Sequence, residues 1–110
     1  MIRIPNRPKY WNKRSNGFDS KREEDRWRDL CFLERAGKIH DLKRQVRFEL
    51  IPAQYDDGRC IERACTYYAD FTYMEGKRLV VEDCKGYRTD VFKIKKKLML
   101  WVHHIRIRET

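Results

Sequence analysis

The sequence predicts one domain of the α/β class, in its α+β form, with the element order helix, three-stranded meander, helix, strand. A capped helical segment from residue 20, three alternating segments between residues 45 and 86, and a second capped segment from residue 89 predict this order. The chain has 110 residues, enough for one domain with a modest core. Recognition and chemistry must therefore share one surface of the domain at 18–110.

Residues 1–17 are expected to form a basic N-terminal arm. This segment contains five cationic residues, no acidic residue, and the aromatic residues Tyr10 and Trp11. Such an arm can lie along phosphates and stack on an unpaired base. The alternative is a solvated terminus with Trp11 packed onto the domain. The candidate DNA-binding cations here are Arg7, Lys9, Lys13 and Arg14.

The first helix is expected from Ser20 to about Ala36, with Gly37 as its C-terminal stop. Glu23 falls on the same side as Trp27 and the leucines of this segment, which places its carboxylate toward the core. It is a candidate metal ligand. The pattern Ser20-Lys21-Arg22-Glu23 is also a capping box, in which Glu23 bonds back to the Ser20 amide. Both interpretations remain open, and the neighbouring Glu24 is a further candidate.

Three strands are expected near 45–54, 60–74 and 78–86, with turns at Asp56-Asp57-Gly58 and Glu75-Gly76. The first strand alternates in the manner of a half-buried sheet. One face carries Gln45, Arg47 and Glu49, and the other carries Val46, Phe48 and Leu50.

Thr89-Asp90 is expected to cap the second helix. Four apolar residues at helical spacing are assigned to the core, namely Val91, Ile94, Leu98 and Trp101. Four lysines lie between them, at Lys93, Lys95, Lys96 and Lys97, and we expect phosphate contact rather than only a solvated face. A final strand is expected at 104–108. His103 and His104 are expected to be structural or surface residues.

Two carboxylates and a lysine form the candidate catalytic site. Asp70 lies on the second strand, and Asp83-Cys84-Lys85 ends the third strand, so Asp83 and Lys85 share one face. Antiparallel pairing of these strands brings both carboxylates toward one cation, and oxygen ligands of this kind suit Mg²⁺ or Mn²⁺. Lys85 could orient the attacking water and offset charge in the transition state. The alternative is a salt bridge from Lys85 to Asp70 or Asp83 at the sheet end.

The composition indicates a polyanionic partner. Lysine and arginine total 26 against 17 acidic residues, which gives a formal charge of +9. No apolar stretch approaches the roughly 20 residues that span a membrane, and no signal-peptide core follows the N-terminus. We therefore expect a cytoplasmic protein. The four cysteines form no Cys-x-x-Cys pair and are expected to be reduced thiols; a zinc site from Cys60, Cys65 and His103 or His104 is an alternative.

The element order, with a glutamate on the first helix, an aspartate on the second strand and Asp-x-Lys on the third, resembles the PD-(D/E)XK nuclease superfamily. The segments Phe18-Asp19-Ser20-Lys21-x-Glu23, Tyr68-Ala69-Asp70-Phe71, Val80-Val81-Glu82-Asp83-x-Lys85-Gly86 and Thr89-Asp90-Val91-Phe92-x-Ile94-Lys95 are similar to small phage nuclease-like proteins. Their nearest functional analogues are the endonuclease I type Holliday junction resolvases. Ala69 stands where the superfamily pattern has proline, and Asp83 where glutamate is commoner.

This resemblance implies a restriction-endonuclease-like αβββαβ core, with a central mixed sheet flanked by helices. It implies Glu23, Asp70, Asp83 and Lys85 as catalytic residues, with Mg²⁺ or Mn²⁺ held by the three carboxylates. Lys21 joins the arm and the lysines of the second helix as an expected DNA contact.

The expected function is a Mg²⁺-dependent endodeoxyribonuclease acting on branched DNA in the cytoplasm of a phage-infected bacterium. Because a four-way junction needs two symmetric cuts, we expect a homodimer, and no small-molecule cofactor. A non-catalytic DNA-binding module with the nuclease fold, or a nicking or site-specific endonuclease on duplex DNA, are the alternatives.

Overall fold

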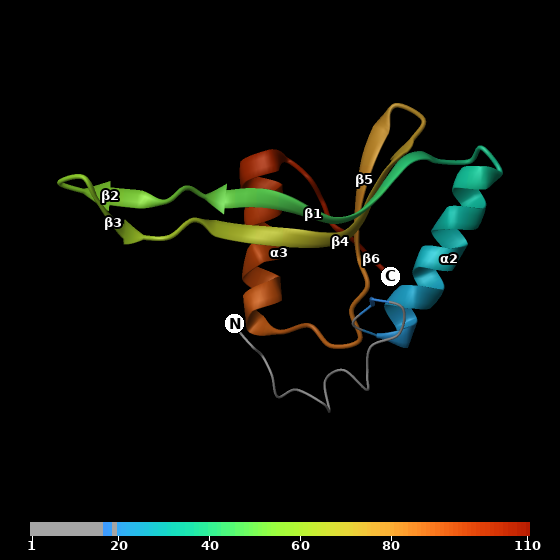
Figure 1. Cartoon of the computed structure of the whole chain (residues 1–110), viewed down its shortest axis with the longest axis horizontal. Helices are drawn as coiled ribbons and strands as arrows, with labels where there is room; N and C mark the ends of the chain where they lie inside the picture. The colour runs from blue at the N-terminus through green and yellow to red at the C-terminus, as the bar shows by residue number, and fades with distance from the viewer. Residues whose placement is uncertain (1–16, 19) are drawn as a thin grey trace.

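The computed structural model describes Gly17, Phe18 and residues 20–110 (Figure 1). The arm cations Arg7, Lys9, Lys13 and Arg14 lie outside the described residues. In this part of the chain the fold is α+β, with a mixed central sheet and two helices, which confirms the expected class. Its elements are α2 (Lys21–Arg35), β1 (His40–Ile51), β2 (Gln54–Asp56), β3 (Arg59–Glu62), β4 (Cys65–Glu75), β5 (Arg78–Asp83), α3 (Asp90–His103) and β6 (Arg108–Glu109).

Helix α2 begins and ends at the residues that the sequence indicates. Ser20 is the N-cap, and its Oγ accepts a hydrogen bond of 3.1 Å from the Glu23 amide. At the other end Gly37 has a φ of 77°, a conformation that glycine adopts without steric cost. The Lys38 amide then donates to the Leu33 carbonyl at 2.9 Å, which closes the helix.

The main sheet has the strand order β1-β4-β5-β6. Strands β1, β4 and β5 are antiparallel neighbours, whereas β6 runs parallel to β5. The predicted meander is therefore correct in topology, but its first strand begins at His40, five residues before the expected start. The hairpin of β2 and β3 forms a separate two-stranded sheet. It interrupts the two long predicted strands and projects away from the helices (Figure 1).

The last predicted strand was wrong in extent, because only Arg108–Glu109 pair with β5. Helix α3 continues to His103, and His104 adopts a left-handed conformation with a φ of 60° as the C-cap. Its amide donates to the Leu100 carbonyl at 3.1 Å. The residues assigned to the start of a strand are thus used to end the helix.

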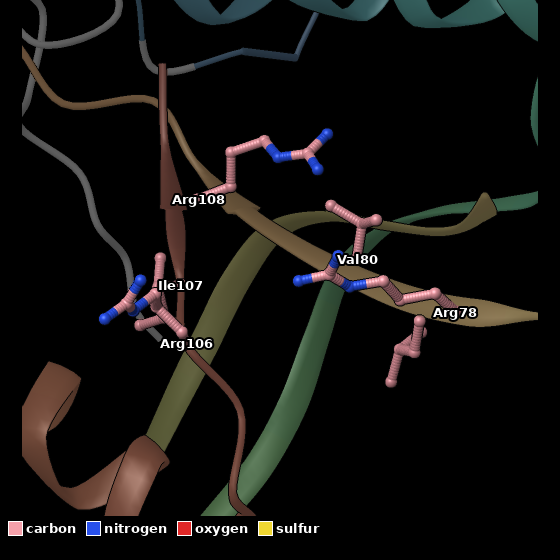
Figure 2. A pocket seen from close by; sticks show the side chains of 6 residues that line it. Arg78, Val80, Arg106, Ile107 and Arg108 are labelled. Carbon is pink, nitrogen blue, oxygen red and sulfur yellow. The ribbon is translucent and has the colours of Figure 1, made fainter.

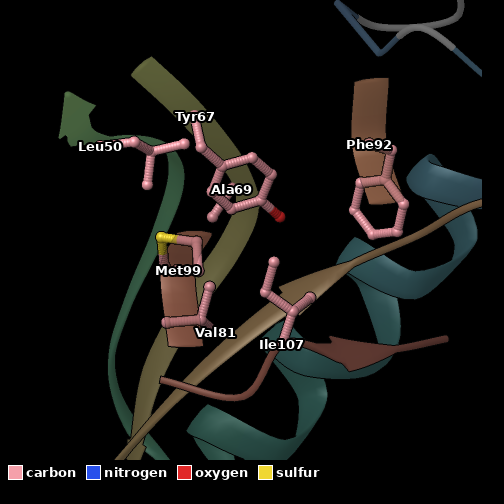
Figure 3. Packing of buried hydrophobic residues seen from close by; sticks show 7 residues of the cluster. All are labelled: Leu50, Tyr67, Ala69, Val81, Phe92, Met99 and Ile107. Atoms are coloured by element: carbon pink, nitrogen blue, oxygen red, sulfur yellow. The ribbon is translucent and has the colours of Figure 1, made fainter. Parts of the chain in front are cut away.

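Two apolar clusters lie between the sheet and the two helices. The α3 cluster consists of Leu50, Tyr67, Ala69, Val81, Phe92, Met99 and Ile107 (Figure 3). The α2 cluster consists of Phe18, Leu30, Ile39, Phe71, Tyr73 and Val80. Ala69 and Phe71 both lie on β4 but belong to different clusters, so Asp70 lies where the strand passes from one cluster to the other.

The predicted core face of α3 was wrong by one residue for three of its four members, whereas Leu98 is half-buried and packs against the α3 cluster as expected. Val91, Ile94 and Trp101 are 60%, 56% and 80% exposed, whereas Phe92 and Met99 are buried. One residue corresponds to about 100° around a helix. The apolar pattern contains two faces, and the sequence alone does not state which one meets the sheet.

Candidate active site

Strands β4 and β5 bring Asp70 and Asp83 together at the end of β5. The register pairs Phe71 with Glu82, which makes Asp70 and Asp83 the next opposed positions. The Cys84 amide, directly after β5, donates a hydrogen bond of 2.8 Å to Asp70 Oδ2. Asp70 and Asp83 therefore lie at opposed positions of neighbouring strands, with the Asp70 carboxylate against the backbone at the end of β5.

Asp83 is held rigidly in a buried position. Only 1% of the residue is exposed, and Tyr67 on β4 donates a hydrogen bond of 2.5 Å to Asp83 Oδ2. Burial and the bond to Asp83 raise the pKa of Tyr67, so the phenol remains a proton donor. Among the described residues, Asp83 Oδ1 accepts no hydrogen bond.

Lys85 lies beside that oxygen. Its Nζ is 3.3 Å from Asp83 Oδ1 and 4.9 Å from the ring centroid of Phe92, the buried residue in the first turn of α3. The ion pair is the one that the purely structural interpretation anticipated. These contacts also hold the Lys85 ammonium beside the Asp83 carboxylate, as the catalytic interpretation requires. Both interpretations are therefore consistent with this geometry.

Asp70 is less enclosed than Asp83 and has a raised pKa. Burial is the main cause, the Cys84 amide opposes it, and the charge of Asp83 adds to it. Two carboxylates that repel each other in a partly desolvated place are stabilised by any cation that enters between them.

Glu23 reaches the same place from the first turn of α2. The residue is 4% exposed, and its Oε2 accepts a hydrogen bond of 3.3 Å from Gln45 Nε2. The same Gln45 nitrogen lies 3.5 Å from Asp70 Oδ1. Gln45 therefore links the helix carboxylate to the strand carboxylate. The Ser20 half of the predicted capping box forms on the Glu23 amide, while the Glu23 carboxylate accepts a bond from Gln45.

Gln45 was not among the site residues expected from the sequence. It lies on β1 opposite Asp70, between the paired residues Arg44 and Val46, and has a φ of 52°. A non-glycine residue in this conformation carries local strain, which is common at functional sites. From the sequence, Gln45 could be placed only on the polar face of β1. Nothing in the sequence indicated that Glu23 and Asp70 would be its hydrogen-bond partners.

Two other acidic residues near the site have different partners. Glu24 is buried, and its Oε2 lies 3.3 Å from Arg28 Nη2, one turn along α2. Glu82 points to the opposite face of β5 and forms two bonds with Arg26, at 2.9 and 2.7 Å. Burial raises the pKa of Glu82, but the bonds from Arg26 and Tyr73 outweigh it and the pKa is lowered. Glu82 is thus a paired structural carboxylate.

The lysines of α3 divide into two groups. Lys93 and Lys97 are exposed, whereas Lys95 and Lys96 are half-buried, and Lys96 lies 2.5 Å from Glu109. A groove of about 330 Å³, the α3 groove, runs beside them. Its lining is Arg88, Lys93, Lys96, Lys97 and Leu100. Lys21 is exposed on α2 and lies 3.1 Å from Asp25, which neutralises part of its charge.

The donor chemistry of the site fits Mg²⁺. Its side chains offer carboxylate and amide oxygens, and Mg²⁺ usually takes one or two carboxylates and keeps several waters. Within Gly17, Phe18 and 20–110, no three His, Cys, Asp or Glu side chains form a ready metal-binding group. This holds both for Glu23, Asp70 and Asp83 and for Cys60, Cys65 and the histidines, so the described residues show neither the three-carboxylate site nor the zinc site preformed. The four cysteines are free thiols, as expected.

Comparison with known families places the sequence. A family model described as "Protein of unknown function (DUF1064)" matches residues 7–109. The chain belongs to the DUF1064 family. No curated protein and no solved structure matches it. The match of the DUF1064 model includes all four candidate catalytic residues and Gln45. Among the described residues, no helix is long and apolar enough to cross a membrane.

Proposed function

We propose that this DUF1064 protein is a Mg²⁺-dependent endodeoxyribonuclease with a restriction-endonuclease-like core. The observation that carries the proposal is the meeting of Asp70 and Asp83 beside Lys85, whose Nζ is 3.3 Å from Asp83 Oδ1. Two partly desolvated carboxylates and one ammonium at a sheet end match the requirements of phosphodiester hydrolysis. The resemblance to PD-(D/E)XK nucleases supports the same assignment.

Each residue has a distinct role in the proposed reaction. Asp70 and Asp83, with Glu23, would hold the cation, and Gln45 would orient Glu23 and Asp70. When bound, Mg²⁺ would lower the pKa of a water molecule and place positive charge beside the phosphate. Lys85 would orient the attacking water and stabilise the charge that develops on phosphorus oxygens. The water oxygen forms the new bond to phosphorus as a phosphorus–oxygen ester bond breaks.

The α3 groove supports a DNA partner. Lys93 and Lys97 are exposed beside it, and the loop residue Arg88 connects the groove to Lys85 in the chain. Cations along such a surface neutralise backbone phosphates whatever the base sequence. Lys95 and Lys21 are the weaker contributors to this surface, because one is half-buried and the other lies close to Asp25.

Branched DNA and a homodimer remain parts of the proposal. Two symmetric cuts in a junction need two sites, and a second copy of the chain supplies the second site. The exposed apolar residues of α3, including Ile94 and Trp101, offer a face for such self-association. Light scattering at assay concentration should give the mass of two chains. A strictly monomeric mass would contradict the homodimer.

The test of the proposed function is cleavage of labelled four-way junction and matched linear duplex, with Mg²⁺, Mn²⁺ or EDTA. Metal-dependent paired cuts near the branch point support a resolvase-like nuclease. Cuts at defined positions of the linear duplex favour a site-specific or nicking enzyme. Salt-dependent binding without products under every metal condition favours the non-catalytic DNA-binding module.

A further inference from the structure

A second groove, the β5 groove, lies at the outer edge of β5, away from Asp70 and Asp83. It has a volume of about 190 Å³ and combines a cationic rim with an apolar floor (Figure 2). Its lining residues are Arg78, Leu79, Val80, Arg106, Ile107 and Arg108. No acidic residue lines it, and of its three arginines only Arg108 is paired with a carboxylate among the described residues, that of Glu75.

The arginines of this groove differ in how firmly they are held. Arg108 donates to the Tyr73 hydroxyl at 3.2 Å and to Glu75 Oε1 at 3.3 Å, which fixes its position. Arg78 and Arg106 are exposed, and the described part of the chain contains no ion pair to either. In Figure 2 the guanidinium groups of Arg78 and Arg108 lie on either side of Val80. Because Arg78 has no ion-pair partner among the described residues, its planar guanidinium can bind an oxyanion with several acceptor oxygens beside Val80.

The floor of the groove is apolar and its edge is unpaired. Val80 and Ile107 are 5% and 3% exposed, so only a small apolar surface remains at the bottom. Strand β6 pairs with β5 only at Glu82 and Asp83, and within the described residues no strand covers the outer edge from Arg78 to Val81. Cations above an apolar floor match the alternating phosphate and deoxyribose units of a nucleic-acid strand.

We propose that this groove binds the phosphodiester backbone of DNA at a distance from the cut. This inference rests on the proposed function for the identity of the ligand as DNA. Arg78 precedes Asp83 by five residues on one strand, which corresponds to about 17 Å. The odd separation places Arg78 on the face of β5 opposite Asp83, so the groove contacts DNA that bends around the outer edge of β5, about 17 Å from the cut.

The position of the groove relative to the α3 groove gives it a specific role. Arg108 lines the β5 groove, while the next residue, Glu109, pairs with Arg88 and Lys96 of the α3 groove. The two cationic grooves thus flank the short strand β6. A DNA strand held at both would have its register fixed relative to Asp83, which a single cationic patch would not provide.

The experiment compares Arg78→Gln/Arg106→Gln with wild type and with Arg59→Gln/Arg63→Gln. The control pair removes the same charge at exposed residues of the projecting β2–β3 hairpin region. Binding of a fluorescent four-way junction and linear duplex is measured in EDTA between about 50 and 200 mM salt, the range over which phosphate contacts change affinity strongly. Circular dichroism checks that every variant is folded.

The groove variant should bind DNA about tenfold more weakly or worse, with a salt slope smaller by about 2, one for each lost phosphate contact. The control pair should match wild type. Equal behaviour of the two pairs would overturn the groove inference alone, since wild-type binding and cleavage would be intact. Absence of DNA binding by wild type would overturn the inference together with the proposed function. Displacement of DNA by poly-glutamate at lower concentration than unlabelled duplex would identify an acidic peptide instead.

Discussion

Tyr67 on β4 donates a hydrogen bond of 2.5 Å to Asp83 on β5, and it does so from within the α3 cluster. The phenol therefore connects the apolar core directly to the candidate catalytic carboxylate. Because Asp83 Oδ1 accepts no hydrogen bond from the described residues, Tyr67 and Lys85 are the contacts that determine where this carboxylate lies. Buried carboxylates of this kind depend on each donor that they retain.

Tyr67→Phe removes this donor and keeps the ring in the core. We expect cleavage to fall by about 10- to 100-fold, the usual effect of removing a residue that orients a metal ligand. DNA binding in EDTA should be unchanged. Single-turnover cleavage and anisotropy titrations measure the two effects separately, and Tyr68→Phe is the matched control because Tyr68 is 53% exposed. Equal cleavage by both variants would exclude the positioning role.

Gln45→Met keeps the length of the side chain and removes the amide that links Glu23 to Asp70. Because Gln45 is exposed, we expect little change in stability. Cleavage should fall by about tenfold or more, with a higher Mg²⁺ concentration needed for half-maximal rate. Gln54→Met on the exposed β2 strand serves as the control. A Mg²⁺ titration that is the same for both variants would show that Gln45 does not act on the cation site.

Asp70→Asn should stabilise the metal-free protein while it abolishes cleavage. The pKa of Asp70 is raised above its ordinary value of 3.8, so the folded protein binds this proton more tightly than the unfolded chain. That contribution is fully present below pH 3.8 and is lost as the pH rises through the folded-state pKa. Denaturant unfolding in EDTA at pH 4 and 7 should show the gain from Asn mainly at pH 7. A less stable variant at pH 7 would contradict the argument.

Arg26→Met should destabilise the fold, because it leaves Glu82 buried without its cation. The expected loss is about 3 kcal/mol at pH 7. The pKa of Glu82 is lowered from its ordinary 4.5, so the pair stabilises above pH 4.5 and is lost as the pH falls through the folded-state pKa. Urea unfolding should therefore show a smaller difference from wild type at pH 3. Arg26→Met/Glu82→Gln should recover part of the loss, and a double variant less stable than the single one would contradict this account.

The sequence predicts some parts of this site and not others, for physical reasons. Asp83 and Lys85 follow from strand alternation, and Asp70 follows from the short turn that sets the β4–β5 register. Gln45 could not be assigned, because its left-handed backbone and its contact with a helix 22 residues away are tertiary features.

The faces of α3 show the same limit. Its start was predicted from Thr89, and the Thr89 cap is observed. Both Val91 and Phe92 begin an apolar series at helical spacing, so periodicity supports two buried faces. Packing against Tyr67 and Val81 selects the Phe92 series. The exposed series is left for the proposed self-association.

The most direct test of the account compares wild type, Asp83→Asn and the control Asp57→Asn on labelled four-way junction with Mg²⁺. Asp57 lies in the β2–β3 turn, so its variant changes the same chemical group away from the site. We expect Asp83→Asn to lose cleavage by about a thousandfold or more while binding the junction in EDTA at least as tightly as wild type. Asp57→Asn should cut normally. Cleavage by Asp83→Asn at the wild-type rate would contradict the assignment of this site.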